Sequence, residues 1–289
     1  MSALDPDLAA YFASLGTLFP PLPADPTPLE RRARYWALVG LGRTPLPSSV
    51  TMNDVQLDLA SGKVGVRLFY GHDGADEPVP TIIYFHGGGW VVGDADTHTV
   101  TCARLAHEAN ALVVSVDYPL APEAHWRTIT DACFEAASAI AADRVAQEAA
   151  TPIAVAGDSA GAHLAAVTAL RARDEGNFHI ALQALLYPTV APDFDTPSYS
   201  EFAAGPGLTR TDMQWYWRHF AGDDQAANDY RIAPTRAASH AGLPPAYVVT
   251  AGRDPLRDEG RSYVRQLRGA GIEVAHDEFD SLPHGFLRM

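Results

Sequence analysis

The sequence has 289 residues, 47% of them hydrophobic, which suffices for one large α/β domain carrying an insertion. Its 35 acidic against 21 basic residues give a formal net charge of −14, which repels phosphate backbones and argues against nucleic acid as a partner. The chain has only two cysteines, no signal-peptide pattern and no apolar run near the ~20 residues that span a bilayer. We therefore expect a cytoplasmic protein with no disulfide framework and no stable membrane association.

The N-terminal segment, residues 1–50, differs in composition from the rest of the chain. It is rich in proline and contains two short helical patterns, near Leu4–Leu15 and Leu29–Val39. We interpret it as a helical cap segment that covers the domain formed by residues 51–289.

Short apolar runs rich in β-branched residues alternate with helical patterns from Asn53 onward. Eight runs are predicted as strands: Val55–Leu59, Val64–Tyr70, Thr81–Phe85, Ala111–Val116, Ile153–Ala156, Leu182–Leu186, Tyr247–Thr250 and Ile272–Ala275. Four patterns are predicted as helices: Thr97–Glu108, Arg127–Ala142, Ala160–Arg173 and Arg257–Gly269. Strands followed by helices favour parallel pairing, so we expect a mostly parallel eight-stranded sheet with helices on both faces. The first two runs have no helix between them and should form an antiparallel hairpin at one edge.

The alternation stops between residues 188 and 245, where an irregular, aromatic-rich helical stretch intervenes. Its large aromatic residues are Phe194, Tyr199, Phe202, Trp215, Tyr216, Trp217 and Phe220. We interpret residues 188–245 as a second cap segment.

The strongest chemical signal is Gly157-Asp158-Ser159-Ala160-Gly161, which lies between a predicted strand and a predicted helix. A sharp turn at this junction forces the central residue into strained backbone angles and pushes the serine hydroxyl outward, while the flanking glycines leave space for the turn. Ser159 is thus the candidate nucleophile. The alternative is an ordinary glycine-rich turn with a capping serine.

A glycine loop, His86-Gly87-Gly88-Gly89-Trp90, follows the predicted strand Thr81–Phe85. Unshielded amides in such a loop can stabilise a tetrahedral oxyanion, and the amide of Ala160, next to the nucleophile, can add a donor. A turn without function is one alternative. A nucleotide-binding loop is another, but the chain contains neither G-x-x-x-x-G-K-[ST] nor G-x-G-x-x-G.

A serine nucleophile needs a histidine base and an acid that orients the base, in this chain order when the strand-turn-helix signature holds. Asp254 and His284 each follow a late predicted strand and fit these roles. His276 falls in or at the end of the last strand. Asp258 and Glu259 compete as acids, but they lie in the first turn of a helix, where a carboxylate commonly just complements the helix dipole.

Metal chemistry finds little support in the sequence. His107-Glu108 begins an H-E-x-x-H string, but Ala111 occupies the place of the second histidine, and no C-x-x-C occurs. We expect neither a metal nor a cofactor.

These motifs together resemble the hormone-sensitive-lipase-like esterases, the bacterial family IV carboxylesterases, from about residue 50 to the end. Four blocks carry the resemblance: His86–Trp90, Asp117–Glu123, Gly157–Gly161, and Asp254–Gly260 with His284-Gly285-Phe286. The resemblance implies an α/β-hydrolase fold and hydrolysis of short- to medium-chain esters without a cofactor. Residue by residue, it implies the triad Ser159, Asp254 and His284 and an oxyanion hole formed by the amides of Gly88, Gly89 and Ala160.

The chain departs from the family pattern in two places. Pro119 stands where the family usually has arginine, and Trp126-Arg127 stand where it usually has a proline, so this loop should differ in shape. Family members generally continue into a further helix, whereas this sequence stops at Met289. We expect a partly bare sheet face, weakly ordered residues at Ser281–Met289 and a homodimer.

Three functions are considered for a chain with these residues. Hydrolysis of small-molecule esters through an acyl-enzyme leads. An amidase or peptidase would use the same triad, but protonating an amine leaving group demands more of the general acid. A catalytically inactive ligand-binding protein on the same fold is the third, and His284 argues against it because the plant gibberellin receptors, which resemble this family, lack the histidine.

Overall fold

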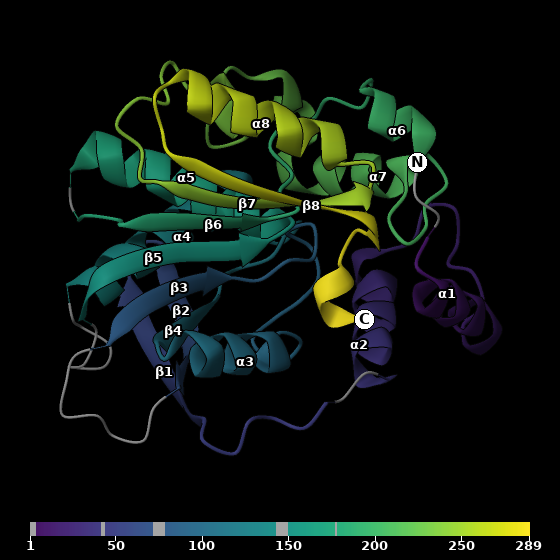
Figure 1. The fold of residues 1–289 in the computed structure, drawn as a ribbon, viewed down its shortest axis with the longest axis horizontal. Helices are drawn as coiled ribbons and strands as arrows, with labels where there is room; N and C mark the ends of the chain where they lie inside the picture. Colours follow the sequence, from purple (N-terminus) through teal and green to yellow (C-terminus); the bar gives the residue numbers. More distant parts are fainter. Residues whose placement is uncertain (1–3, 42–43, 72–78, 143–149, 177) are drawn as a thin grey trace.

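A single eight-stranded sheet organises the computed structural model, which describes residues 4–41, 44–71, 79–142, 150–176 and 178–289 (Figure 1). The strands lie in the order β1-β2-β4-β3-β5-β6-β7-β8. Their bounds are β1 Thr51–Leu59, β2 Gly62–Tyr70, β3 Pro80–Phe85, β4 Leu112–Asp117, β5 Ala150–Asp158, β6 Leu182–Leu186, β7 Ala246–Arg253 and β8 Val274–Pro283. All eight predicted strands are present. The last one begins two residues later than predicted and runs eight residues further, to the loop that carries His284.

The pairing follows the predicted topology. β1 and β2 form an antiparallel hairpin at one edge, and β2 is also antiparallel to β4. The strands from β4 to β8 are parallel to their neighbours. The carboxyl ends of β3, β5, β7 and β8 therefore meet at one edge of the sheet, where loops can bring distant residues together.

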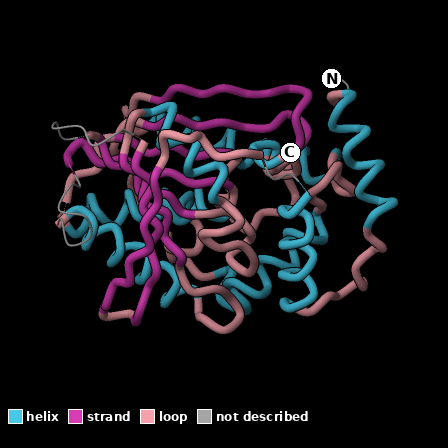
Figure 2. The backbone as a smooth tube through the Cα atoms, turned by 90° about the horizontal axis from the view of Figure 1, so that it is seen from below, coloured by secondary structure: helices cyan, strands magenta, loops and turns pink. Residues whose placement is uncertain are grey.

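Helices cover both faces of the sheet, as expected (Figure 2). α4 (Trp126–Ala141), α5 (Ala160–Glu175) and α8 (Arg257–Gly269) pack on one face and bury the main hydrophobic core. α3 (Thr99–Ala109) packs on the other face in a smaller cluster that includes Phe69 and Tyr84. Cys102 of α3 and Cys133 of α4 are buried and unbonded in these two separate clusters, so no disulfide links them.

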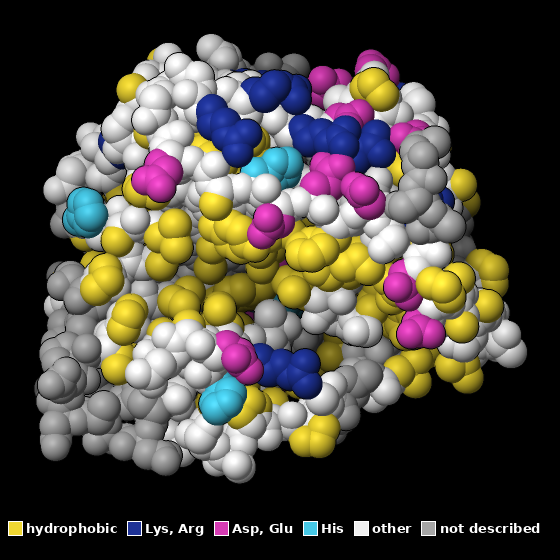
Figure 3. Space-filling view, viewed as in Figure 1, with side chains coloured by type: hydrophobic (Ala, Val, Ile, Leu, Met, Phe, Trp, Pro, Cys, Tyr) yellow, Lys and Arg dark blue, Asp and Glu magenta, His cyan; other side chains and the backbone are white. Residues whose placement is uncertain are grey.

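The face that carries α3 is only partly covered toward β8. Leu182 of β6 and Phe279 of β8 keep 37% and 43% of their surface exposed, whereas Leu185 and Val248, on the opposite face, are fully buried. Apolar side chains gather around a hollow across the middle of the molecule in Figure 3. Leu182 and Phe279 therefore leave apolar surface exposed on this face of the sheet.

The two expected cap segments lie together beyond the carboxyl ends of the strands (Figure 1). The first contains α1 (Pro6–Leu18) and α2 (Pro28–Leu41), and the second contains α6 (Pro197–Glu201), α7 (Arg210–Ala221), η1 (Gly222–Ala226) and η2 (Pro234–Arg236). The indole of Trp215 donates to the carbonyl of Pro26 at 3.0 Å, and Arg31 pairs with Asp212 at 2.6 Å. The segments are thus joined by specific contacts. None of the described helices is long and apolar enough to span a bilayer.

Candidate active site

Ser159 stands on a strained turn between β5 and α5. Its φ of 55° is positive, which is unusual for a residue other than glycine. A side chain at Gly161 would place its Cβ 1.9 Å from the carbonyl oxygen of Phe85, and one at Gly157 would meet Gly161 at 2.4 Å. Both flanking glycines are therefore required by the close approach of neighbouring backbone. The turn matches the one predicted from the sequence, and its serine faces a cavity.

The structure brings Ser159, His284 and Asp254 together from three loops. His284 Nε2 lies 2.9 Å from Ser159 Oγ, and His284 Nδ1 lies 2.7 Å from Asp254 Oδ2. Asp254 is fully buried, and its other oxygen accepts a hydrogen bond from the amide of Leu256. The carboxylate thus fixes the imidazole with Nδ1 protonated, which leaves Nε2 free to accept a proton from the serine hydroxyl.

Two further contacts, which the sequence did not indicate, support His284 and its loop. The ring of Tyr187, just after β6, contacts it edge to face with centroids 4.8 Å apart. The carbonyl of Ser281 accepts a hydrogen bond from the amide of Asp5, at the start of α1. The histidine loop is therefore supported by the first cap segment.

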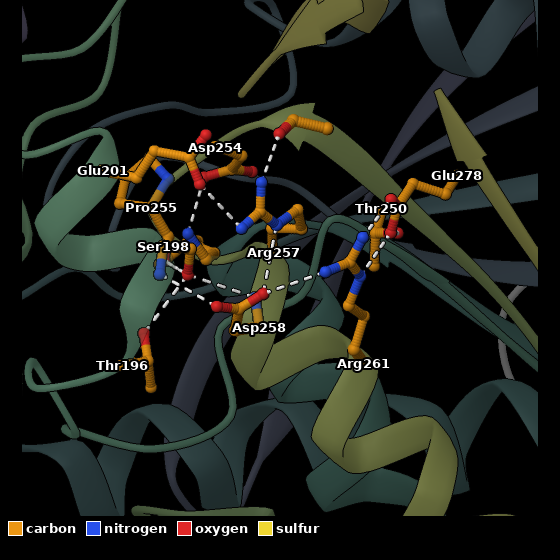
Figure 4. Close-up of polar contacts among 12 residues, drawn as sticks. Thr196, Ser198, Glu201, Thr250, Asp254, Pro255, Arg257, Asp258, Arg261 and Glu278 are labelled. Carbon is orange, nitrogen blue, oxygen red and sulfur yellow. Dashed lines mark hydrogen bonds and ion pairs between the residues drawn. The ribbon is translucent and has the colours of Figure 1, made fainter. Parts of the chain in front are cut away.

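The competing residues have other partners. Asp258 accepts hydrogen bonds from the amide of Ser198 and from Arg257 and Arg261, and so joins α8 to α6 (Figure 4). His276 lies within β8, as predicted, and its ring is 2.9 Å from the hydroxyl of Thr250.

Glu259 is 4% exposed, and one of its oxygens accepts from the amides of Val190 and Ala191. Burial raises its pKa to about 8. The expectation that Asp258 and Glu259 merely complement the helix dipole was wrong, because the sequence does not reveal which loop packs against this helix. Both carboxylates instead organise the second cap segment.

The glycine loop borders the same cavity as Ser159. Gly88 and Gly89 have φ angles of 124° and 58°, and in the described part of the chain their amides donate to no other group. A Cβ on Gly88 would lie 2.0 Å from the carbonyl oxygen of Val92. The amide of Ala160 stands at the first position of α5. Gly88 and Gly89 line the cavity beside Ser159 and Ala160 directly follows the serine, so their amides are the candidate donors to an oxyanion.

A buried carboxylate of the serine turn, Asp158, holds this loop. Asp158 Oδ1 accepts from the amide of Gly87 at 2.8 Å and from the hydroxyl of Tyr84 at 2.9 Å. Burial alone would raise the pKa of Asp158, but His98 holds it below the usual value, so the group is ionised. Burial, with His98 second, lowers the pKa of His86 to about 3, so that ring is neutral.

Arg32 of α2 contacts both the segment that follows the glycine loop and the loop after β4. Arg32 donates to the carbonyl oxygens of Val91 and Ala121 and pairs with Glu123 at 2.6 Å. Trp126, where the family usually has a proline, begins α4, is fully buried and donates its indole hydrogen to Asp224. The loop after β4 is thus fastened by residues from both cap segments, which sequence reasoning could not place.

The cavity has a volume of about 400 Å³. Tyr11, Leu15 and Leu38 of the first cap segment and Met213 and Tyr216 of the second line it together with Ser159 and His284. Within the described ranges, no group of three or more histidine, cysteine, aspartate or glutamate side chains is arranged to hold a metal ion.

Fold and site together define an α/β hydrolase. A family model described as the alpha/beta hydrolase fold matches residues 82–288, and the chain belongs to this family. Its expected kinship with the hormone-sensitive-lipase-like esterases is confirmed.

Particular relatives carry esterase names. The chain is 41% identical to "Esterase LipI" of Mycobacterium tuberculosis over 86% of this chain and 78% of that protein. It is 38% identical to "Carboxylic ester hydrolase LipN" of the same organism over 83% of this chain and 65% of that protein. A crystal structure of a thermostable esterase from Pseudomonas putida superimposes with a TM-score of 0.94 at 30% identity, covering 100% of this chain and 91% of that one. These relatives favour an ester hydrolase over a peptidase or an inactive binding protein.

Proposed function

We propose that this protein is a serine carboxylesterase that cleaves short- to medium-chain esters through an acyl-enzyme. Ser159 is the nucleophile, His284 the general base and Asp254 the orienting acid. The observation that carries the proposal is the unbroken hydrogen-bonded chain from Ser159 Oγ through the His284 ring to buried Asp254. The relatives named as esterases support the reaction class.

The reaction follows from this geometry. Ser159 Oγ attacks the ester carbonyl while its proton moves to His284 Nε2, and Asp254 stabilises the resulting imidazolium. The amides of Gly88, Gly89 and Ala160 stabilise the oxyanion. His284 then protonates the departing alcohol, and a water molecule repeats the sequence on the acyl-enzyme, which releases the acid.

Substitution of the nucleophile tests the proposal. Ser159→Ala should lower kcat for a p-nitrophenyl ester by roughly 10⁴ or more, with an unchanged far-ultraviolet circular dichroism spectrum. Parallel assays on matched aryl esters and anilides separate esterase from amidase, because only the ester should turn over efficiently. Substantial residual activity of the pure variant, or binding without turnover in the unmodified protein, would contradict the assignment.

The cap should limit the size of the substrate. We assign residues 1–50 and 188–245 to a cap over the catalytic domain formed by the rest of residues 51–289. Each buried methylene contributes ~0.8 kcal/mol until the cavity is filled, so turnover should favour acyl chains of about two to eight carbons. Efficient hydrolysis of emulsified long-chain triglyceride would contradict this limit.

We further infer that the protein acts in the cytoplasm and forms a homodimer. Two buried, unbonded cysteines fit a reducing compartment. β8 is an edge strand, and the partly exposed Phe279 and Leu182 offer apolar surface for a second copy. Light scattering that shows a monomer at micromolar concentration would refute the dimer.

A further inference from the structure

Arg31 and Arg288 both line the cavity, and Arg288 forms no ion pair with an acidic side chain of that described lining. Arg288 lies in η3 (Phe286–Arg288), four residues after His284, and lines the cavity together with Ser159. Its Nη1 donates to the hydroxyl of Tyr35 in α2, whereas its Nε is buried with no hydrogen-bond partner. In the part of the chain that the structure describes, no carboxylate forms an ion pair with it within 4.0 Å.

The other cavity arginine is neutralised. Arg31 pairs with Asp212 at 2.6 Å and lies over the Trp215 ring, 4.5 Å from its centroid. Because Arg31 and Asp212 cancel each other, Arg288 gives the lining of this cavity a positive charge that no carboxylate side chain of the described lining pairs with. Ionised Asp158 acts on Arg288 electrostatically but forms no ion pair with it within 4.0 Å, and its Oδ1 already accepts from Gly87 and Tyr84.

A partly desolvated cation without a counter-charge is costly, because it has lost water and a neutral hydroxyl replaces only part of that hydration. A guanidinium presents a planar set of donors that matches a carboxylate, and burial strengthens that pairing. Tyr35 adds to this arrangement, because its oxygen accepts from Arg288 and its own hydrogen remains available to donate. The cavity thus presents donors for an anion beside the candidate nucleophile.

We propose that Arg288, assisted by Tyr35, binds a free carboxylate carried by the substrate, so that the preferred esters are monoanions. The proposal rests on the esterase function and names its substrate class: an ester whose acyl or alcohol half bears a second, unesterified carboxyl group. The carboxylate is bound and is not changed in the reaction. The competing explanation is that Arg288 only fastens η3 to α2.

Matched pairs of esters distinguish the two explanations and also locate the carboxylate. On the acyl side, p-nitrophenyl hydrogen glutarate is compared with p-nitrophenyl pentanoate. On the alcohol side, acetoxyacetate is compared with acetoxyacetamide in a pH-stat. For each pair the measured quantity is the ratio of kcat/KM for the anionic ester to kcat/KM for the neutral one. This ratio should exceed one on the side that carries the carboxylate in the native substrate.

Arg288→Met should lower that ratio by about 10- to 100-fold, the usual effect of losing one charge-assisted hydrogen-bonded pair. Arg288→Lys keeps the charge and loses the planar donors, so its ratio should lie between those of the wild type and Arg288→Met. Arg218→Met is the matched control, because it removes the same charge from α7 outside the cavity lining and should leave the ratio within about twofold.

Two outcomes would overturn the proposal. In the first, Arg288→Met slows the anionic and neutral esters equally, which is the result expected of a purely structural role. In the second, the wild-type ratio is below one on both sides and does not change in the variant.

A failure of the proposed esterase function would look different. The wild type would then hydrolyse no neutral ester faster than Ser159→Ala does. In that case, calorimetric titration of the Ser159→Ala protein with monomethyl glutarate decides the proposal. Binding that is lost in Ser159→Ala/Arg288→Met supports the carboxylate site, and equal binding to both proteins refutes it.

Discussion

The stability of this protein should depend on pH through one buried side chain. Glu259 has a pKa of about 8 in the folded protein against an ordinary value of 4.5, and burial is the main cause. Between these values the folded protein keeps a proton that the unfolded chain releases. The free energy of unfolding therefore falls as pH rises through this window, by about 1.4 kcal/mol per pH unit, or roughly 3 kcal/mol from pH 5 to pH 7.

Glu259→Gln isolates this effect, because an amide cannot titrate. Its carbonyl can accept from Val190 and Ala191, and its amino group can donate to the hydroxyl of Tyr199, so the folded structure should persist. Urea unfolding at fixed ionic strength should give similar free energies of unfolding for wild type and variant at pH 5. At pH 7 the free energy of unfolding should be about 3 kcal/mol higher for the variant.

Glu259→Ala serves as the contrast, since it leaves both amides unpaired at every pH at a cost of about 1–3 kcal/mol each. If the difference between wild type and Glu259→Gln does not change with pH, or if wild type gains stability as pH rises, the native carboxyl is ionised. The reasoning from burial would then be wrong.

Two further substitutions test the site itself. Asp254→Asn should lower kcat for an aryl ester by about 10⁴, because the imidazole loses its correct tautomer, whereas Asp258→Asn should act mainly on the melting temperature by releasing Ser198 of α6. The reverse ranking would move the acid to α8. Gly88→Ala should lower kcat by about 10²–10³ with little change in KM, since a Cβ at this position collides with the carbonyl of Val92. A variant with wild-type kcat would exclude Gly88 from the oxyanion hole.

Local patterns were sufficient to predict the sheet and the candidate triad. The serine turn has a sequence signature because only glycine fits the backbone contacts on either side of Ser159, and the strand-to-loop order restricts the acid and the base to late positions. Asp254 and His284 could be selected because each directly follows a predicted strand.

The supporting residues could not be predicted, since their roles arise from packing between distant segments. Arg32 contacts Val91 and Ala121 only after α2 has docked, and Glu259 becomes buried only because the loop at Val190 folds over the start of α8. Nothing in the sequence near Arg288 distinguishes it from a surface arginine. In the folded protein it donates to Tyr35, 253 positions earlier in the chain, and lines the cavity.

The contacts between the two cap segments, Trp215 with Pro26 and Arg31 with Asp212, also restrict the order of assembly. The N-terminal arm leaves the ribosome first, yet Pro26 and Arg31 meet Trp215 and Asp212 only 189 and 181 residues later in synthesis. Contacts so distant in sequence form late, because the intervening chain must first be brought together. During translation the arm therefore cannot dock until Asp212 and Trp215 have been made, and the cavity cannot be completed before His284, which also lines it, has followed.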